Sequence, residues 1–367
     1  MKIPYVNLPK QYFKERKSLL SVIDKVLSSG LYVGGDQVEK FEKNISSLIK
    51  VKHCIALNSG TDALTLGLHC LGVKKNDEVI TTSNSFIAST AVIVHLGAKP
   101  VFVDVKKDQN IDPNLIERFI TKKTKAIMAV HLTGRVCDMD KIISISKKYN
   151  IPIIEDAAQA IGSKYKNKFA GTFGKVGCFS AHPLKNLNAL GDSGYLTTNS
   201  SKIAKIIRDV RNHGMTNRNK IKNFGYVSRM DNLQAAVLNF RLKNLNLIIK
   251  KRRENASIYF KNLNKKYIFI PPETKKEHNT YHTFVIQVSK RDKLKKYLKS
   301  KNIETSIHYP IPIHLQPAFK KLKYPCSGLT ITEKQSKEII TLPINQFLKK
   351  IEIKRICKEI NNFYENI

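Results

Sequence analysis

The sequence predicts an α/β fold built on a mainly parallel sheet. Between about residues 50 and 200, short apolar runs alternate with segments of helical periodicity, and several of the runs end in polar residues. Strand–helix–strand repetition of this kind is typical of a parallel sheet covered by helices. The runs expected as strands are 53–57, 78–82, 101–104, 126–130, 151–155 and 177–180. The segments expected as helices between them are 63–71, 87–96, 114–120 and 139–149.

The pattern changes in the last third of the chain. Helices are expected at 201–212 and 231–262, followed by a strand at 282–288 and a basic helix at 290–301. In the basic helix, Leu294, Tyr297 and Leu298 keep helical spacing, so its charges form a solvated face. A length of 367 residues suits two domains. The two predicted domains are a large α/β domain, 1–250, and a small α+β domain, 251–367.

The charge is unusual, because 64 Lys and Arg against 29 Asp and Glu give a net charge of +35. This charge suits a nucleic-acid binder, an enzyme for phosphorylated substrates, or a composition biased towards Lys, Asn and Ile. No basic stripe is interleaved with aromatic residues, so we expect no nucleic-acid partner.

Membrane, secreted and metal-binding classes are not indicated. No stretch approaches the ~20 apolar residues of a membrane span, and the first residues lack the apolar core of a signal peptide. The six cysteines are scattered without a Cys-x-x-Cys motif, so neither a disulfide framework nor a metal site is expected. We therefore expect a cytoplasmic protein.

Segment 58–64, Asn-Ser-Gly-Thr-Asp-Ala-Leu, follows a predicted strand and opens a helix. Free N–H groups at a helix N-terminus suit a phosphate, and Gly60 and Thr61 stand at this point. An ordinary N-cap explains the same residue types, so the motif alone does not decide between the two.

Segment 153–160 runs from a buried-type strand into Glu155 and Asp156. Ligands of open α/β sheets bind at the carboxyl ends of strands. A carboxylate backed by apolar residues there needs a cationic partner, either a protonated pyridine nitrogen or a structural lysine.

Segment 178–187 places Lys185 just beyond a strand, with Ser180 five residues earlier. A Schiff-base lysine needs a lowered pKa, which partial burial or a nearby cation supplies. A phosphate cup, an acidic strand end and a Ser-x-x-x-x-Lys loop, in this order, together describe a pyridoxal-phosphate site.

At these residues the sequence resembles the DegT/DnrJ/StrS family of pyridoxal-phosphate-dependent sugar aminotransferases, and the resemblance covers nearly the whole chain. It implies a fold-type I enzyme that works as a homodimer with shared active sites. The matching segments are 29–35, 38–42, 58–64, 84–89, 155–160, 182–186, 225–231, 234–236 and 307–314.

The resemblance implies a role for each matching residue. Lys185 would hold the cofactor and shuttle the proton, Asp156 would pair with the pyridine nitrogen, and Gln159 would reach the ring hydroxyl. The remaining expected contacts are stacking by Phe86, phosphate binding by Gly60, Thr61 and Ser180, and substrate binding by His182, Arg218, Lys220, His308 and Tyr309. Without the resemblance, Phe86 would be read as a core residue and His308 as a satisfied loop histidine.

Two positions separate this chain from some members of the family. Some relatives dehydrate sugars and carry histidine in place of the lysine, so Lys185 favours transamination. Val227 stands where the family usually has an asparagine that reaches the phosphate of the neighbouring subunit. Valine has no side-chain donor, which puts this contact in doubt.

The expected function is transfer of an amino group from an amino acid, with glutamate as the expected donor, to a nucleotide-linked keto-sugar. A sugar dehydratase and a nucleic-acid-binding regulator are the alternatives. Segment 185–192 looks more like members that act at C3 of the sugar than at C4.

Overall fold

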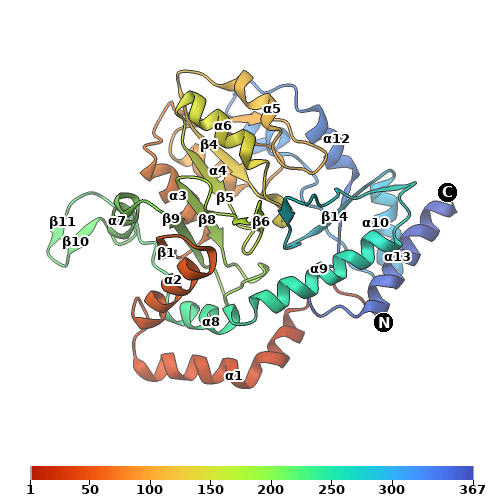
Figure 1. The fold of residues 1–367 in the computed structure, drawn as a ribbon, viewed down its shortest axis with the longest axis horizontal. Helices are drawn as coiled ribbons and strands as arrows, with labels where there is room; N and C mark the ends of the chain where they lie inside the picture. The colour runs from red at the N-terminus through yellow and green to blue at the C-terminus, as the bar shows by residue number, and fades with distance from the viewer. Residues whose placement is uncertain (1, 367) are drawn as a thin grey trace.

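A computed structural model describes residues 2–366, in which a seven-stranded mixed sheet forms the centre (Figure 1). Its strand order is β1-β9-β8-β5-β4-β2-β3, and only β9 runs antiparallel to its neighbours. The strands are β1 (His53–Leu57), β2 (Glu78–Thr82), β3 (Lys99–Val103), β4 (Thr124–Val130), β5 (Ile153–Asp156), β8 (Val176–Ser180) and β9 (Gly194–Thr198). The predicted mainly parallel sheet is confirmed.

Helices cover both faces of this sheet, because side chains of each strand alternate between two cores. In β1, Cys54 and Ala56 belong to one core, and Ile55 and Leu57 to the other. The first core is covered by α2 (Asp36–Ile49), α6 (Met139–Tyr149) and α8 (Asn232–Leu242). The second is covered by α3 (Gly60–Cys70), α4 (Ala88–His95) and α7 (Ser201–Val210).

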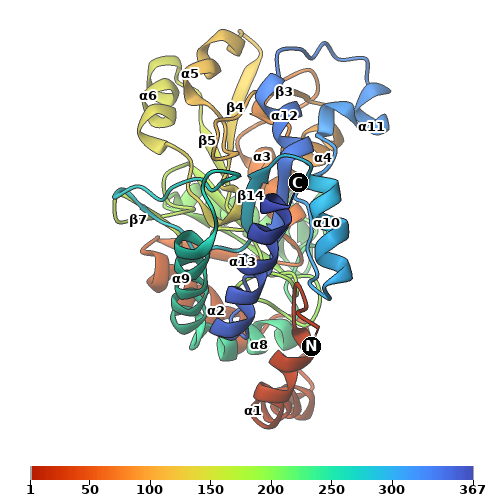
Figure 2. The same cartoon turned by 90° about the vertical axis from the view of Figure 1, so that its right-hand side faces the viewer.

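The C-terminal part builds a third core around a small antiparallel sheet of order β12-β14-β15. Its strands are β12 (Ile268–Phe269), β14 (Phe284–Val288) and β15 (Ile339–Leu342). Figure 2 shows α10 (Arg291–Ser300) and α13 (Lys350–Glu365) beside β14. The N-terminal segment joins this part, because Ile3 forms a parallel bridge with Ile303.

Helix α9 (Leu245–Asn262) belongs to two cores. Its residues Leu245 and Ile249 pack in the first core of the large sheet, whereas Ala256 and Tyr259 pack in the C-terminal core. The predicted domain boundary at residue 250 falls between these two sets. The division into domains 1–250 and 251–367 stays a prediction.

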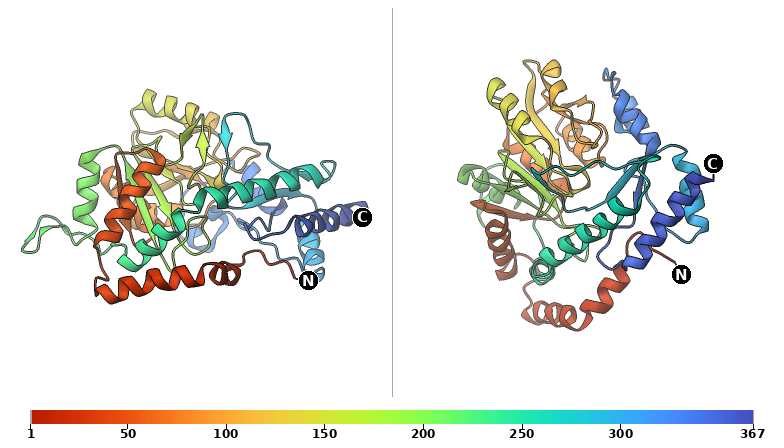
Figure 3. Two further views of the ribbon diagram at one scale, coloured as in Figure 1. Left: turned by 60° about the horizontal axis from the view of Figure 1, so that its bottom comes forward. Right: turned by 45° about the vertical axis from the view of Figure 1, so that its right-hand side comes forward.

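Smaller elements complete the part of the chain that the structure describes. Figure 3 shows α1 (Leu8–Ser29) along the outside of the molecule and the β10–β11 hairpin projecting from it. The other elements are α5 (Pro113–Ile116), β6 (Lys164–Tyr165), β7 (Lys168–Phe169), β10 (Met215–Asn217), β11 (Lys220–Ile221), β13 (Glu277–His278), α11 (Pro317–Lys320), α12 (Thr330–Glu338) and three short 3-10 turns. Within residues 2–366, none of the helices has the length and apolar character needed to cross a membrane.

Within the central part of the chain, several elements differ from the sequence predictions. The helix expected at 231–262 is broken into α8 and α9 at Lys243 and Asn244, where asparagine has a low helix propensity. The helix expected at 114–120 is one α-helical turn followed by a 3-10 turn. Strand β9 was not predicted, because its sequence follows a Gly-rich loop and runs directly into polar residues.

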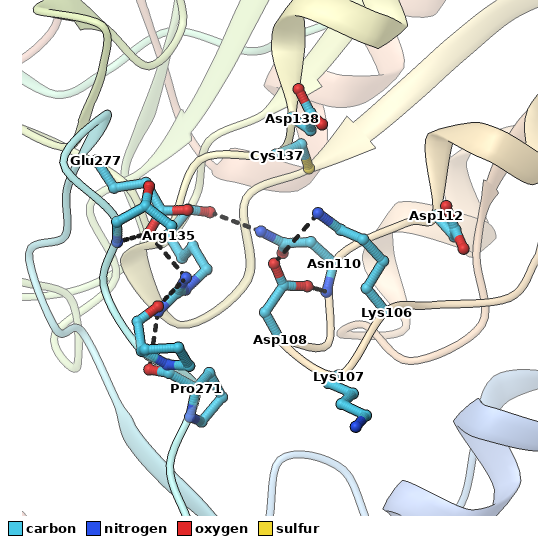
Figure 4. A network of polar contacts seen from close by, with 12 residues as sticks. Lys106, Lys107, Asp108, Asn110, Asp112, Arg135, Cys137, Asp138, Pro271 and Glu277 are labelled. Atoms are coloured by element: carbon cyan, nitrogen blue, oxygen red, sulfur yellow. Dashed lines mark hydrogen bonds and ion pairs between the residues drawn. The ribbon is translucent and has the colours of Figure 1, made fainter.

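Arg135 ties the large sheet to the C-terminal part (Figure 4). Its Nη1 lies 2.8 Å from Glu277 Oε2, and the guanidinium also donates to the carbonyls of Pro271 and Pro272. The Arg135 carbonyl accepts from Asn110 Nδ2, and Asn110 Oδ1 accepts from Leu132 N. The loop after β4 is therefore fixed on both sides.

Candidate active site

A cavity of about 470 Å³ opens where β1, β4, β5 and β8 reach their carboxyl ends. This is the edge at which open α/β sheets bind ligands. Ten of the twelve residues predicted for the site line it, namely Gly60, Thr61, Phe86, Asp156, Gln159, Ser180, His182, Lys185, His308 and Tyr309. Segments far apart in the sequence are therefore brought together as expected.

Asp156 is the last residue of β5, and its side chain is only 6% exposed. Its Oδ2 accepts a 2.7 Å hydrogen bond from Ser89 Oγ, and its Oδ1 accepts from Ala158 N at 3.2 Å. These bonds fix the carboxylate and leave acceptor capacity toward the cavity. The Asp156 carboxylate could therefore accept a hydrogen bond from a protonated ring nitrogen.

The neighbouring Glu155 has a different role, because successive strand residues point to opposite faces. Its carboxylate accepts from the backbone N–H groups of Gly171, Phe173 and Gly174 and from His131 Nε2. It holds the turn before β8. Of the two carboxylates in the motif, only Asp156 lines the cavity.

Lys185 lies in a loop closed by main-chain hydrogen bonds. Ala181 N donates to Ser193 O at 2.7 Å, and Ala189 N donates to Ala181 O at 2.8 Å. Burial lowers the pKa of Lys185 to about 8, and the Asp156 carboxylate acts in the opposite direction. A neutral amine is therefore accessible near physiological pH, as a nucleophilic lysine requires.

A cup with free N–H groups, of the kind that suits an anion, forms at the start of α3. Ser59 caps the helix by accepting from Asp62 N, and first-turn N–H groups such as those of Gly60 and Thr61 have no acceptor inside a helix. Close packing with β8 and β9 shapes the cup. A Cβ on Gly60 would lie 2.6 Å from Ser180 Cβ, and one on Gly194 would lie 2.2 Å from the Ser59 carbonyl carbon.

Aromatic and polar side chains flank the cavity. Phe86 is 56% exposed, so the interpretation of this ring as a core residue is wrong. The centroid of its ring lies 6.2 Å from that of the Tyr309 ring. The Tyr309 hydroxyl accepts a long 3.5 Å hydrogen bond from Gln159 Nε2. His308 has a partner, Thr341 Oγ1 at 2.9 Å, and still lines the cavity. Burial, helped by the charge of Lys185, lowers the pKa of His308 to about 4, so this ring is neutral.

The predictions for Arg218 and Lys220 find no support here, because neither residue lines the cavity. They lie on the projecting β10–β11 hairpin and are exposed. Val227 is also exposed, and its backbone pairs with Asn212.

Several cavity residues were not assigned from the sequence, among them Tyr5, Ser89, Arg252 and His282. Ser89 lies inside the matching segment 84–89, which was the available signal. The other three come from the N-terminal segment and from the region after residue 250. No local motif marks them.

The fold, together with Asp156 and Lys185 in one cavity, defines an aminotransferase of the pyridoxal-phosphate class. Residues 14–361 match the DegT/DnrJ/EryC1/StrS aminotransferase family, and the chain belongs to this family.

Curated relatives are similar over almost their full length. The dTDP-3-amino-3,6-dideoxy-alpha-D-galactopyranose transaminase of Aneurinibacillus thermoaerophilus is 39% identical over 362 residues, which is 98% of this chain and 99% of the relative. A protein of Geobacillus stearothermophilus named pleiotropic regulatory protein is 38% identical over 370 residues, all of both chains.

Solved structures share the fold. DesV of S. venezuelae superposes with a TM-score of 0.97 at 34% identity, covering 100% of this chain and 99% of that one. The ntda protein of Bacillus subtilis, crystallised with bound PMP, gives a TM-score of 0.93 at 33% identity, covering 99% and 85%.

The residues present fit pyridoxal phosphate, which the family uses as its cofactor. The cup of α3 and Ser180 suits the phosphate, Asp156 suits a protonated ring nitrogen, and Lys185 suits the aldehyde. Gly60 and Gly194 stand where a side chain would clash with the cup or distort it. When bound, the cofactor supplies a ring that withdraws the electron pair left by the breaking C–H bond.

Proposed function

We propose that this enzyme transfers the amino group of an amino acid, with glutamate as the donor, to the keto group of a nucleotide-linked sugar. The observation that carries the proposal is the common cavity of Lys185 and Asp156. The name of the A. thermoaerophilus relative supports a nucleotide keto-sugar as acceptor. The expected setting is the cytoplasm.

The proposed chemistry assigns one task to each of these two side chains. Lys185, once its amine is free and neutral, would take up the proton that leaves the substrate carbon and hold it for return. Its lowered pKa suits a general base at neutral pH. The Asp156 carboxylate stabilises positive charge on the ring nitrogen. Lysine, rather than histidine, at position 185 favours transamination over dehydration.

We also propose a homodimer in which each cavity is completed by the partner. The hairpin region carries exposed apolar side chains, namely Ile221, Phe224, Tyr226 and Val227. Exposed apolar groups of this kind mark interaction surfaces. Arg218 and Lys220 of the same region would then reach the diphosphate in the neighbouring cavity. A catalytically active monomer in sedimentation would contradict this proposal.

The substrate proposal is tested with purified enzyme, glutamate and a panel of nucleotide keto-sugars. Amino transfer is expected to be fast with a nucleotide keto-sugar and slow with the same sugar lacking the nucleotide. Added salt is expected to raise KM, because charge pairs on an exposed hairpin are screened. Equal rates on pyruvate or oxaloacetate would place the enzyme among general amino-acid aminotransferases.

The regulator alternative has a simple test, because a bare nucleic-acid binder does not hold the cofactor. The purified protein is expected to be yellow and to lose its colour on addition of glutamate. A colourless protein that cannot be loaded with pyridoxal phosphate would favour the regulator.

A further inference from the structure

A second group of side chains lines the same cavity but comes from outside the central sheet. Tyr5 lies in the N-terminal segment, Arg252 in α9, and His282 just before β14. None of them takes part in the chemistry described so far. All three belong to the part of the cavity wall that the C-terminal half and the N-terminus contribute.

Arg252 is a buried cation whose acceptors are all neutral. Its side chain is only 7% exposed, and Nη1 donates to the carbonyls of Tyr281 and His282, each at 3.1 Å. Nη2 makes only a long 3.4 Å contact with Gln346 Oε1, and Nε is buried without an acceptor. Within residues 2–366, no carboxylate lies at ion-pair distance from this guanidinium.

This guanidinium remains charged. Burial lowers the pKa of Arg252 to about 10, which still leaves it protonated at neutral pH. A buried charge without a counterion is costly. Such a group in a cavity is a candidate for binding an anion.

His282 lines the same cavity as Lys185, and its carbonyl accepts from Arg252. Burial lowers the pKa of His282 well below its usual range, and the charges of Lys185 and Arg252 add to the shift. The ring is therefore neutral, and its Nδ1 is buried without a partner. Tyr5 lines the same cavity, and the charge of Arg252 opposes the rise that burial causes in the pKa of the Tyr5 hydroxyl. Arg252 thus supplies the charge, and its neighbours supply neutral polar groups.

We propose that Arg252 binds a substrate carboxylate in this cavity, and that the α-carboxylate of the amino donor is this group. The inference rests on the proposed function and deepens it. Every α-amino-acid donor carries a carboxylate on the carbon whose proton Lys185 removes, so an anion site in the cavity of Lys185 orients that carbon. The weak contact of Nη2 with Gln346 is the bond that an incoming carboxylate replaces, since charge-assisted bonds are the stronger ones.

A matched pair of donors tests the assignment. L-Glutamate and 4-aminobutyrate share an amine and a distal carboxylate, but only glutamate has an α-carboxylate. Loss of the cofactor's colour in single-turnover mixing measures each donor half-reaction. Arg252→Gln is expected to lower the rate constant for glutamate by on the order of 10². The α-carboxylate then lies in a buried polar site without the guanidinium that pairs with it. The rate with 4-aminobutyrate is expected to change much less. An unchanged ratio of the two rates would overturn the proposal.

The sugar half-reaction separates the two sources of a carboxylate. The amine-loaded enzyme is mixed with a neutral nucleotide keto-sugar and with a keto-sugar that bears a uronate group. Similar rates for wild type and Arg252→Gln on both sugars are expected. A loss confined to the uronate would assign the site to the sugar and overturn the donor assignment.

Arg253 provides the control on the same helix. It pairs with Glu273 at 2.7 Å and does not line the cavity. Arg253→Gln is expected to keep the ratio of glutamate to 4-aminobutyrate rates. A change in that ratio as large as that of Arg252→Gln would show a general effect of charge on α9 and overturn the inference.

Binding of glutarate supplies a readout that does not depend on turnover. Glutarate keeps both carboxylates of glutamate but has no amine to react, and calorimetry with the holoenzyme measures its affinity. Wild type is expected to bind it and Arg252→Gln to lose on the order of tenfold or more in affinity. No binding by wild type would overturn the proposal even if Arg252→Gln fails to fold.

The two proposals fail in different ways. A wild type that loses no colour with any amino acid contradicts the proposed function, whereas the glutarate titration still tests Arg252. A wild type that transaminates, with unaltered donor selectivity in Arg252→Gln, contradicts only the carboxylate site. Arg252→Lys, which keeps the charge but not the planar fork, is expected to restore part of the glutarate affinity.

Discussion

Ser89 donates a 2.7 Å hydrogen bond to Asp156 across 67 positions of sequence, and both side chains are buried. Ser89 is the second residue of α4, and Asp156 ends β5. The hydroxyl therefore orients a carboxylate that arises from the centre of the sheet. The position of the Asp156 carboxylate depends on the packing of α4 as well as on β5, the strand that carries it.

Replacement of Asp156 by asparagine is expected to lower turnover by on the order of 10², because it removes the charge that stabilises a protonated ring nitrogen. Steady-state kinetics of the loaded enzyme measures the effect. Glu155→Gln is the matched control, since Glu155 accepts backbone N–H groups away from the cavity. This control is expected to lower the melting temperature while the loaded fraction keeps its turnover. Unchanged turnover in Asp156→Asn would make Asp156 structural.

Ser89→Ala is expected to keep the charge of Asp156 but to remove the hydrogen bond that fixes the orientation of its carboxylate. We expect a loss in kcat of roughly tenfold, in keeping with ~1.5 kcal/mol for a hydrogen bond to a charged group. A pH titration of the cofactor's absorbance distinguishes positioning from a structural effect, because a displaced carboxylate shifts the titration. Rescue by Ser89→Thr, which retains a hydroxyl, is the accompanying test. A normal titration together with normal kcat would refute the positioning role.

Lys185→Ala is expected to abolish amino transfer and to leave the melting temperature nearly unchanged, since a partly buried loop lysine contributes little packing. Borohydride reduction of the loaded wild type followed by peptide mapping is expected to place the label on Lys185. A label on another lysine would refute the assignment.

The pKa of Lys185 predicts how the cofactor-free protein loads. Only the neutral amine attacks an aldehyde, so the loading rate should rise about tenfold per pH unit and level off near the pKa of about 8. Stopped-flow absorbance with added pyridoxal phosphate measures the profile. A rate that keeps rising toward the ordinary lysine value of 10.5 would show that burial does not lower this pKa.

Gly194→Ala is expected to weaken cofactor binding by tenfold or more, because its Cβ would lie 2.2 Å from the Ser59 carbonyl carbon and displace the start of α3. Gly191→Ala is the control, where the nearest atom to the new Cβ is Gln234 Nε2 at 3.4 Å. Equilibrium titration of both variants with the cofactor compares the affinities. Equal affinities would show that the cup tolerates the shift.

The parts of the site that could be predicted are those encoded within one short segment. Gly60, Asp156 and Lys185 each follow an apolar run, so a strand, its end and the direction of its side chains are visible in the sequence. Their convergence follows from a parallel sheet, which brings the carboxyl ends of strands to one edge.

The parts that could not be predicted depend on packing between distant segments. Nothing in the sequence near Arg252 distinguishes it from the other cations of a chain with 64 Lys and Arg residues. Arg252 differs from them because α9 packs against the loop at Tyr281 and His282, which buries its guanidinium in the cavity wall. The position of the antiparallel β9 between β1 and β8 could not be predicted either, since the order of strands is a property of the whole sheet.

The sharing of α9 between two cores has a consequence for how the protein unfolds. Unfolding of either core would leave apolar residues of α9 without their packing partners. The free energies of unfolding of the large-sheet part and the C-terminal part are therefore not independent. Heating is therefore expected to give a single cooperative transition, with equal calorimetric and van't Hoff enthalpies. For the same reason, a chain divided inside α9 would give two fragments that each lack part of a core, rather than two autonomous folding units.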